Sequence, residues 1–218
     1  MSKTEILVQK FGGTSLADLK GFEASAAVIG QYAAERRVVV VLSAVKGVTD
    51  LLLAAIDTAV DGGDGAVPLH EALGRQRAII EELSGLGVST LLASEFLQEQ
   101  EDVLGRRVEG IRLLGQCPEE ARARILASGE GFSSRLMVDV LNHRGLHAQW
   151  SDTDVLPLAN EDWLDSLVDI DAAAPRLRER LQPDTQVMVL PGFYGRNAQG
   201  KIQLLGRNGT DYSAAAIA

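Results

Sequence analysis

A lysine followed by two glycines and two hydroxyl side chains lies close to the N-terminus. Residues 10–15 read Lys-Phe-Gly-Gly-Thr-Ser and come directly after the apolar run 6–9. Glycine lets the backbone approach a ligand closely, and consecutive N–H groups form an anion-binding concavity. A helix beginning at Leu16 would add a dipole that favours negative charge. No lysine follows the glycines, so this is not a P-loop. The segment predicts a phosphate site, or else a strand–turn–helix joint with a surface lysine.

Two further segments contain residues suited to binding a small charged ligand. Residues 205–214 read Leu-Gly-Arg-Asn-Gly-Thr-Asp-Tyr-Ser-Ala, and residues 128–130 read Ser-Gly-Glu, followed by Ser133 and Ser134. Together with residues 10–15, these segments resemble the signatures of aspartate kinases, in the amino-acid kinase superfamily. The three matches occur in the family's order and extend over nearly the whole chain.

The resemblance implies an activity, the ATP-dependent phosphorylation of the L-aspartate β-carboxylate to 4-phospho-L-aspartate. This is the first step of lysine, threonine and methionine biosynthesis. An aspartate carboxyl has an unperturbed pKa of about 3.9, so it is already a nucleophile at neutral pH and needs no general base. The site must hold two anions and neutralise the transferring phosphoryl group with lysine, backbone N–H groups and the Mg²⁺ of MgATP. None of the histidines (His70, His143 and His147) lies in a motif.

The resemblance also assigns the residues that meet ATP and part of the amino acid. Lys10 would bridge phosphate oxygens in the transition state, and Gly12 and Gly13 would donate backbone N–H groups to the phosphates. Ser43 and Thr49 match family positions near the substrate. From the residues alone, the alternative roles of these two are a helix cap and a turn hydroxyl, and for Thr49 this alternative has equal weight.

Three charged residues complete the predicted site. Glu130 would meet the substrate's α-ammonium group, although without the family it reads as a solvated helical glutamate. Arg207 would act in catalysis by clamping a substrate carboxylate through its bidentate fork. Asp211 would help Glu130 hold the ammonium, or else it is a helix N-terminal charge. Asn208 and Thr210 stand where the family often has glycine and serine, and asparagine tolerates a left-handed backbone.

Composition excludes several classes of protein. The chain has 218 residues, 46% of them hydrophobic, and a net charge of −9. This acidic balance argues against nucleic acid as the main partner, because such binding depends on basic patches. Cys117 is the only cysteine, so no disulfide can form within the chain. The longest apolar run (38–42) is too short to span a bilayer, and no apolar core of a signal peptide follows Met1. We therefore expect a cytoplasmic protein without a membrane partner. The apolar run at the end of the sequence also favours self-association, so we expect a homo-oligomer.

Alternating strand and helix patterns predict an α/β fold. A buried strand is expected at 5–9 and another at 38–44, with a crossover helix at 17–36 between them. A helical insertion is expected at about 66–116, broken near 85–87. Further expected elements are helices at 48–60, from Pro118, at 137–142 and at 172–181 (closed by Pro183), strands at 147–150 and 187–190, and a hairpin with arms 192–196 and 201–205. The resemblance implies a three-layer αβα sandwich with a mostly parallel central sheet, the amino-acid kinase fold, truncated at its C-terminus.

The end of the sequence suggests a part of a larger enzyme. Residues 212–218 form an apolar helical run with no stop signal, and we expect it to pack against something that follows. Aspartate kinases continue into a nucleotide-binding lobe and regulatory modules. Residues 1–218 would then be the amino-acid-binding part, inactive alone. Residues 113–118 resemble, more weakly, the aspartokinases fused to homoserine dehydrogenase.

Two alternative functions remain open from the sequence. An amino-acid kinase could use another carboxylate acceptor, such as glutamate or its N-acetyl derivative. A non-catalytic amino-acid-binding module could keep the aspartate half without turnover.

Overall fold

A four-stranded parallel sheet forms the centre of the molecule. In the computed structural model, which describes residues 5–181 and 185–218, the strand order is β1 (Ile6–Phe11), β2 (Arg37–Leu42), β4 (Val187–Pro191) and β3 (Ala148–Trp150). β2 and β4 are valine-rich and buried on both faces, as central strands of parallel sheets are. The predicted closure of a helix by Pro183 and the start at Met1 lie outside the described residues.

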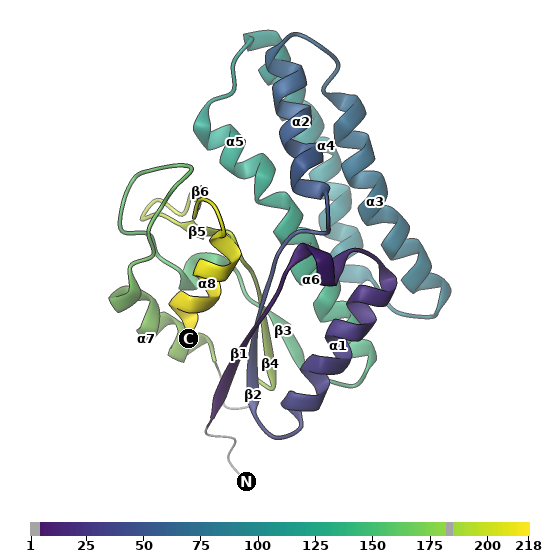
Figure 1. Cartoon of the computed structure of the whole chain (residues 1–218), viewed down its shortest axis with the longest axis vertical. Coiled ribbons are helices and arrows are strands. Elements are labelled where there is room, and N and C mark those ends of the chain that lie inside the picture. The colour runs from purple at the N-terminus through teal and green to yellow at the C-terminus, as the bar shows by residue number, and fades with distance from the viewer. Residues whose placement is uncertain (1–4, 182–184) are drawn as a thin grey trace.

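Helices cover both faces of this sheet. The helices involved are α1 (Leu19–Ala33), α6 (Ser128–His143), α7 (Ile170–Arg180) and α8 (Gly209–Ile217). Val38 and Val40 of β2 belong to the core shared with α1 and α6, whereas Val39 belongs to the core shared with α7 and α8. In Figure 1, α1 and α6 accordingly lie on one side of the sheet and α7 and α8 on the other. The predicted three-layer αβα sandwich is confirmed.

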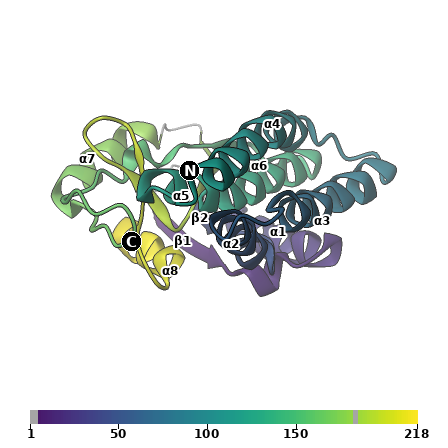
Figure 2. The same cartoon turned by 90° about the horizontal axis from the view of Figure 1, so that it is seen from above.

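A bundle of helices extends beyond one end of the sheet. It consists of α2 (Val48–Val60), α3 (Ala66–Gly85), α4 (Leu91–Leu114) and α5 (Glu119–Leu126), which form the upper part of Figure 1 and are seen from above in Figure 2. α3 and α4 occupy the predicted insertion. Asp139 of α6 ties the bundle to the core, because its carboxylate accepts backbone N–H bonds from Leu92 and Ala93 (3.4 and 3.0 Å). No helix in the described residues is long and apolar enough to cross a membrane.

The last part of the chain returns to the sheet through a hairpin. β5 (Tyr194–Arg196) and β6 (Ile202–Leu204) pair antiparallel, as predicted. α8 then packs its Tyr212, Ala216 and Ile217 against the core on the α7 side. The Val168 N–H also donates to the Tyr212 hydroxyl (3.0 Å). Segments that precede α8 therefore cover its apolar side.

Candidate active site

A pocket of about 480 Å³ lies where β1 and β2 end. In parallel sheets, the carboxyl ends of neighbouring strands meet at one edge, where ligands commonly bind. All the predicted site residues except Arg207 line this pocket, namely Lys10, Gly12, Gly13, Ser43, Thr49, Glu130 and Asp211. The fold thus brings together residues from the beginning, the middle and the end of the chain.

Lys10 and Asp211 join the two glycine-containing motifs. The Lys10 ammonium lies 2.9 Å from Asp211 Oδ1, and the two side chains are 28% and 62% exposed. Exposed pairs of this kind stabilise a fold by only about 0–1 kcal/mol. The pair therefore matters chiefly because it holds two opposite charges in the lining of the pocket.

The N-termini of two helices face the same space. Gly47 (φ 78°) precedes α2, and Asn208 (φ 59°) precedes α8, so both helices begin after a left-handed residue. Unpaired N–H groups at helix N-termini favour anions. The expected tolerance of Asn208 for a left-handed conformation is confirmed. Gly13 is also constrained, because a Cβ there would lie 2.9 Å from the Ala44 carbonyl oxygen.

Glu130 is buried in the pocket wall. Its residue is 4% exposed, and its Oε2 has no hydrogen-bond partner among the described residues. Burial raises the pKa of Glu130 to about 8, although backbone N–H groups, first that of Ala44, oppose the shift. The reading of Glu130 as a solvated glutamate is therefore wrong. Its carboxyl is mostly neutral at pH 7, and a cationic ligand beside it would favour ionisation.

Hydrogen bonds from two serine hydroxyls connect three segments of the chain at the wall of the pocket. Ser43 follows β2, which ends at Leu42 rather than at the predicted residue 44, and its hydroxyl donates to Thr210 Oγ1 (3.0 Å). Ser133 of α6 donates to the Ser43 carbonyl (2.6 Å). Thr49 lies in the first turn of α2, whose N-cap is Gly47, so Thr49 is not a helix cap.

Arg207 stands apart from the other predicted residues. It is exposed on the loop before α8, does not line the pocket, and makes no hydrogen bond or ion pair with any described residue. The structure therefore does not bring Arg207 together with Glu130. The lysines at the pocket are Lys10 and Lys46.

Sequence reasoning missed Lys46 and Phe193, both of which line the pocket. Lys46 sits in the short turn before α2, and its position after a buried strand was the available signal. Phe193 has φ 73°, which is unusual for a bulky residue and typical of strained functional sites. Its N–H donates to Ser213 Oγ (3.1 Å), which holds this conformation. No sequence pattern indicated it.

The pocket combines two ammonium groups, two helix N-termini and one buried carboxyl. Such a set suits a small molecule that carries both negative and positive charge, next to a phosphate group. No histidine lines it, and no group of three His, Cys, Asp or Glu side chains in the described parts of the chain could hold a metal ion.

Comparisons with known proteins agree with this arrangement. The model of the Amino acid kinase family matches residues 5–218. Lysine-sensitive aspartokinase 3 of Escherichia coli is 32% identical over 99% of this chain and 46% of its own length. A bifunctional aspartokinase/homoserine dehydrogenase of Buchnera aphidicola is 28% identical over 96% of this chain and 26% of its own length.

A solved structure is similar over the same region. Escherichia coli aspartokinase III in complex with aspartate and ADP has a TM-score of 0.82 and 30% identity, covering 98% of this chain and 46% of that one. This chain thus spans between about a quarter and a half of the length of these relatives. On the family match and the shared fold, the chain belongs to the amino acid kinase family.

Proposed function

We propose that these residues form the amino-acid-binding part of an aspartate kinase. The enzyme would transfer the γ-phosphoryl group of ATP to the β-carboxylate of L-aspartate, giving 4-phospho-L-aspartate and ADP. The observation that carries the proposal is the pocket that gathers Lys10, Glu130 and Asp211 at the sheet edge. The similarity to an aspartokinase solved with aspartate and ADP supports the choice of substrates.

The proposed reaction needs charge neutralisation more than proton transfer. A β-carboxylate oxygen forms a bond to the γ-phosphorus while the bond from that phosphorus to the bridging oxygen breaks, and ADP keeps that oxygen. Charge is spread over the phosphoryl oxygens in the transition state. Lys10 would stabilise that charge, and Gly12 and Gly13 would donate backbone N–H groups to the phosphates. Mg²⁺ bound together with ATP would supply further positive charge to the phosphates.

The amino acid would be held at its ammonium and its carboxylate. Glu130, whose pKa burial raises to about 8, would ionise when the α-ammonium binds beside it. Asp211 would add a second negative charge, and Ser43 and Thr49 would contribute hydroxyls. Arg207 would turn from its exposed position to clamp a substrate carboxylate.

The remaining assignments extend the proposal to the whole enzyme. The adenine-binding surface and the regulatory modules would be supplied by residues outside these 218, with α3 and α4 as the helical insertion. We place the enzyme in the cytoplasm, as a homo-oligomer, in lysine, threonine and methionine biosynthesis.

A coupled ADP-release assay tests the proposal. The 218-residue chain and a longer protein that continues with the following reading frame are each assayed with L-aspartate, L-glutamate and N-acetylglutamate. We expect aspartate-dependent ADP release from the longer protein and none from the 218 residues, because without the adenine site the γ-phosphate is not oriented. Near-normal activity of the 218 residues would contradict the placement of the nucleotide site. Activity with a different acceptor, or with none, would contradict the proposed substrate.

A further inference from the structure

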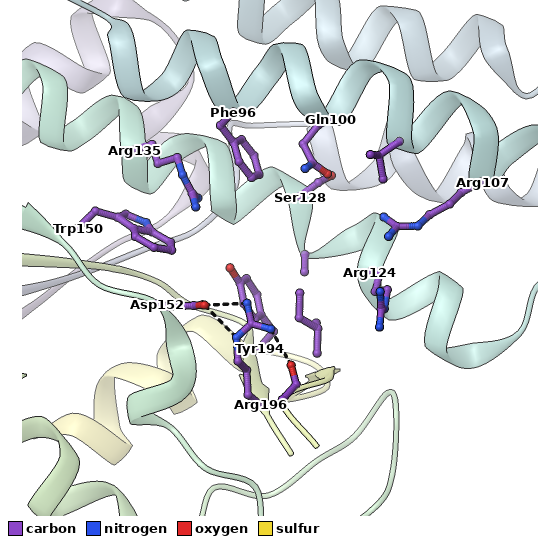
Figure 3. A pocket seen from close by; sticks show the side chains of 14 residues that line it. Phe96, Gln100, Arg107, Arg124, Ser128, Arg135, Trp150, Asp152, Tyr194 and Arg196 are labelled. Carbon is purple, nitrogen blue, oxygen red and sulfur yellow. Dashed lines mark hydrogen bonds and ion pairs between the residues drawn. The ribbon is translucent and has the colours of Figure 1, made fainter. Parts of the chain in front are cut away.

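A second cavity, of about 480 Å³, shares no lining residue with the candidate active site. It lies between the helical bundle and the β5–β6 hairpin, and four arginines from four different elements line it. These are Arg107 of α4, Arg124 of α5, Arg135 of α6 and Arg196 of β5. Figure 3 shows Arg107 and Arg196 extending toward the same space from opposite walls. We call this space the arginine cavity.

Two of the four arginines have carboxylate partners. Arg196 holds Asp152 Oδ2 through Nε and Nη2 (3.0 and 2.7 Å), as drawn in Figure 3. Arg124 Nη2 lies 2.9 Å from Glu120, but Glu120 also pairs with Lys201 (3.0 Å). The carboxylate of Glu120 is therefore shared by two cations.

Arg135 and Arg107 have no carboxylate partner among the described residues. Arg135 lies over the rings of Phe96 (4.2 Å) and Trp150 (3.8 Å), and it donates to the Gly131 carbonyl (2.8 Å). The rings hold the guanidinium in place and leave other N–H groups available. Arg107 makes no hydrogen bond or ion pair with any described residue, although it is partly buried in the cavity wall.

The cavity therefore concentrates positive charge in an acidic protein. Its lining holds four guanidinium groups and a single carboxylate, that of Asp152, whereas the whole chain has a net charge of −9. Burial, followed by the charges of Arg124 and Arg106, lowers the pKa of Arg107, and the charge of Glu120 opposes this only in part. Arg124 Nε is also buried without a partner. An anion in the cavity would relieve this repulsion and satisfy these donors.

We propose that the arginine cavity binds a small multivalent oxyanion, a compact molecule that carries two or more phosphate or carboxylate groups. Guanidinium groups bind phosphate groups and carboxylate groups alike in a bidentate manner. Arg107 and Arg135 provide the unpaired charge, and the buried Tyr194 hydroxyl adds a further hydrogen-bonding group. This site is separate from the proposed kinase site, and neither proposal depends on the other.

Calorimetric titration of the 218-residue chain with pyrophosphate and with citrate tests the proposal and distinguishes the two chemistries. Thermal unfolding is followed in parallel, with sodium chloride at matched ionic strength as reference. We expect at least one of the two anions to bind with a Kd below about 1 mM and to raise Tm with concentration. Absence of binding and of any shift beyond that in sodium chloride would overturn the proposal.

Two variants on one helix locate the site. Arg107→Gln should weaken binding at least about tenfold, because it removes a charged bidentate donor from the cavity. Arg106→Gln is the matched control, since Arg106 is exposed, adjacent, and gives the same change in net charge. It should change the affinity by less than about twofold, because the Arg106 side chain is exposed, does not line the cavity and has its charge screened by solvent. Equal effects of the two variants would overturn the proposal.

Two more variants keep the test decisive. Gln100 lines the cavity from α4, so Gln100→Glu places a carboxylate there and should also weaken binding, even if Arg107→Gln fails to fold. In a Lys10→Ala background, which removes the charged phosphate contact of the other pocket, Arg107→Gln should still weaken pyrophosphate binding at least about tenfold, because the two pockets share no lining residue. No effect of Arg107→Gln in that background, or full binding in Gln100→Glu, would mean that the anion is held elsewhere.

Discussion

Lys10 Nζ and Asp211 Oδ1 lie 2.9 Å apart, although these residues belong to opposite ends of the chain. β1 delivers the lysine at its carboxyl end, and the first turn of α8 delivers the aspartate. The contact forms because α8 packs next to β1 on the face of the sheet that it shares with α7. Two motifs that are distant in sequence thus become one charged wall of one pocket.

Replacing Lys10 tests its proposed role in phosphoryl transfer. In the longer, active enzyme, Lys10→Ala should lower kcat by about 100-fold or more, because it removes a charge needed mainly in the transition state. Steady-state kinetics measure this, with Lys20→Ala, an exposed lysine of α1, as the control. If turnover of Lys10→Ala stays within about threefold of wild type, Lys10 does not stabilise the phosphoryl group.

Replacing Arg207 tests whether this exposed side chain reaches the substrate. Arg207→Lys keeps the charge and loses the planar fork, so KM for aspartate should rise at least about tenfold while KM for ATP stays nearly constant. The two Michaelis constants are measured in the same ADP-release assay. An equal rise in both, or no rise in either, would argue against a carboxylate clamp.

The buried carboxyl of Glu130 predicts a pH-dependent stability. Its pKa is about 8 in the folded chain against 4.5 in the reference state, so between these values the folded state keeps a proton that the unfolded state has lost. The contribution of this group to the free energy of unfolding is fully present below about pH 4.5. Between pH 4.5 and about pH 8, the free energy of unfolding falls by about 1.4 kcal/mol per pH unit.

Glu130→Gln removes this titration, so its stability relative to wild type should increase from pH 5 to pH 8. Urea unfolding of both proteins at several pH values gives the difference. Asp139, whose pKa burial raises to about 6, is present in both proteins and cancels. A difference that does not change with pH would show that Glu130 is not held in its neutral form.

Close packing around Gly129 predicts that a methyl group is not tolerated there. A Cβ at Gly129 would lie 2.7 Å from Ala44 Cβ, whereas a Cβ at Gly110, within α4, would meet nothing within 4 Å. Gly129→Ala should destabilise the chain by about 1–3 kcal/mol, and Gly110→Ala should stabilise it by about 0.5–1 kcal/mol. Thermal unfolding of both variants and of the wild type measures these differences in stability. Gly129→Ala with wild-type stability would contradict the close approach of α6 to the loop after β2.

Local patterns predicted most of the fold. The strand–helix–strand unit, the helix at Val48–Val60 and the hairpin around 197–200 were all readable from periodicity and turn residues. The observed ends of strands differ from the predicted ones where pairing with a strand distant in sequence decides them. β2 stops at Leu42 because its partner β4 ends at Pro191.

The site was only partly predictable. Residues 10–15 and 205–214 carry the composition of ligand-binding loops, so the sequence indicated them. The burial of Glu130 depends on how α6 packs against Ala44. The position of the Lys46 ammonium group at the pocket depends on where the loop after β2 turns. The arginine cavity collects side chains from four elements that have no common spacing. Tertiary packing brings these side chains together, so no local sequence pattern could have predicted the cavity.

Binding of L-aspartate to the 218-residue chain is the most direct test of the central claim, that this pocket is an amino-acid site with Glu130 as the ammonium partner. Isothermal titration at pH 7 should show binding of L-aspartate, with weaker binding of D-aspartate and L-glutamate. Glu130→Gln, which cannot supply a negative charge, should weaken L-aspartate at least about tenfold. No binding of L-aspartate by the folded chain, or equal binding by Glu130→Gln, would contradict the account.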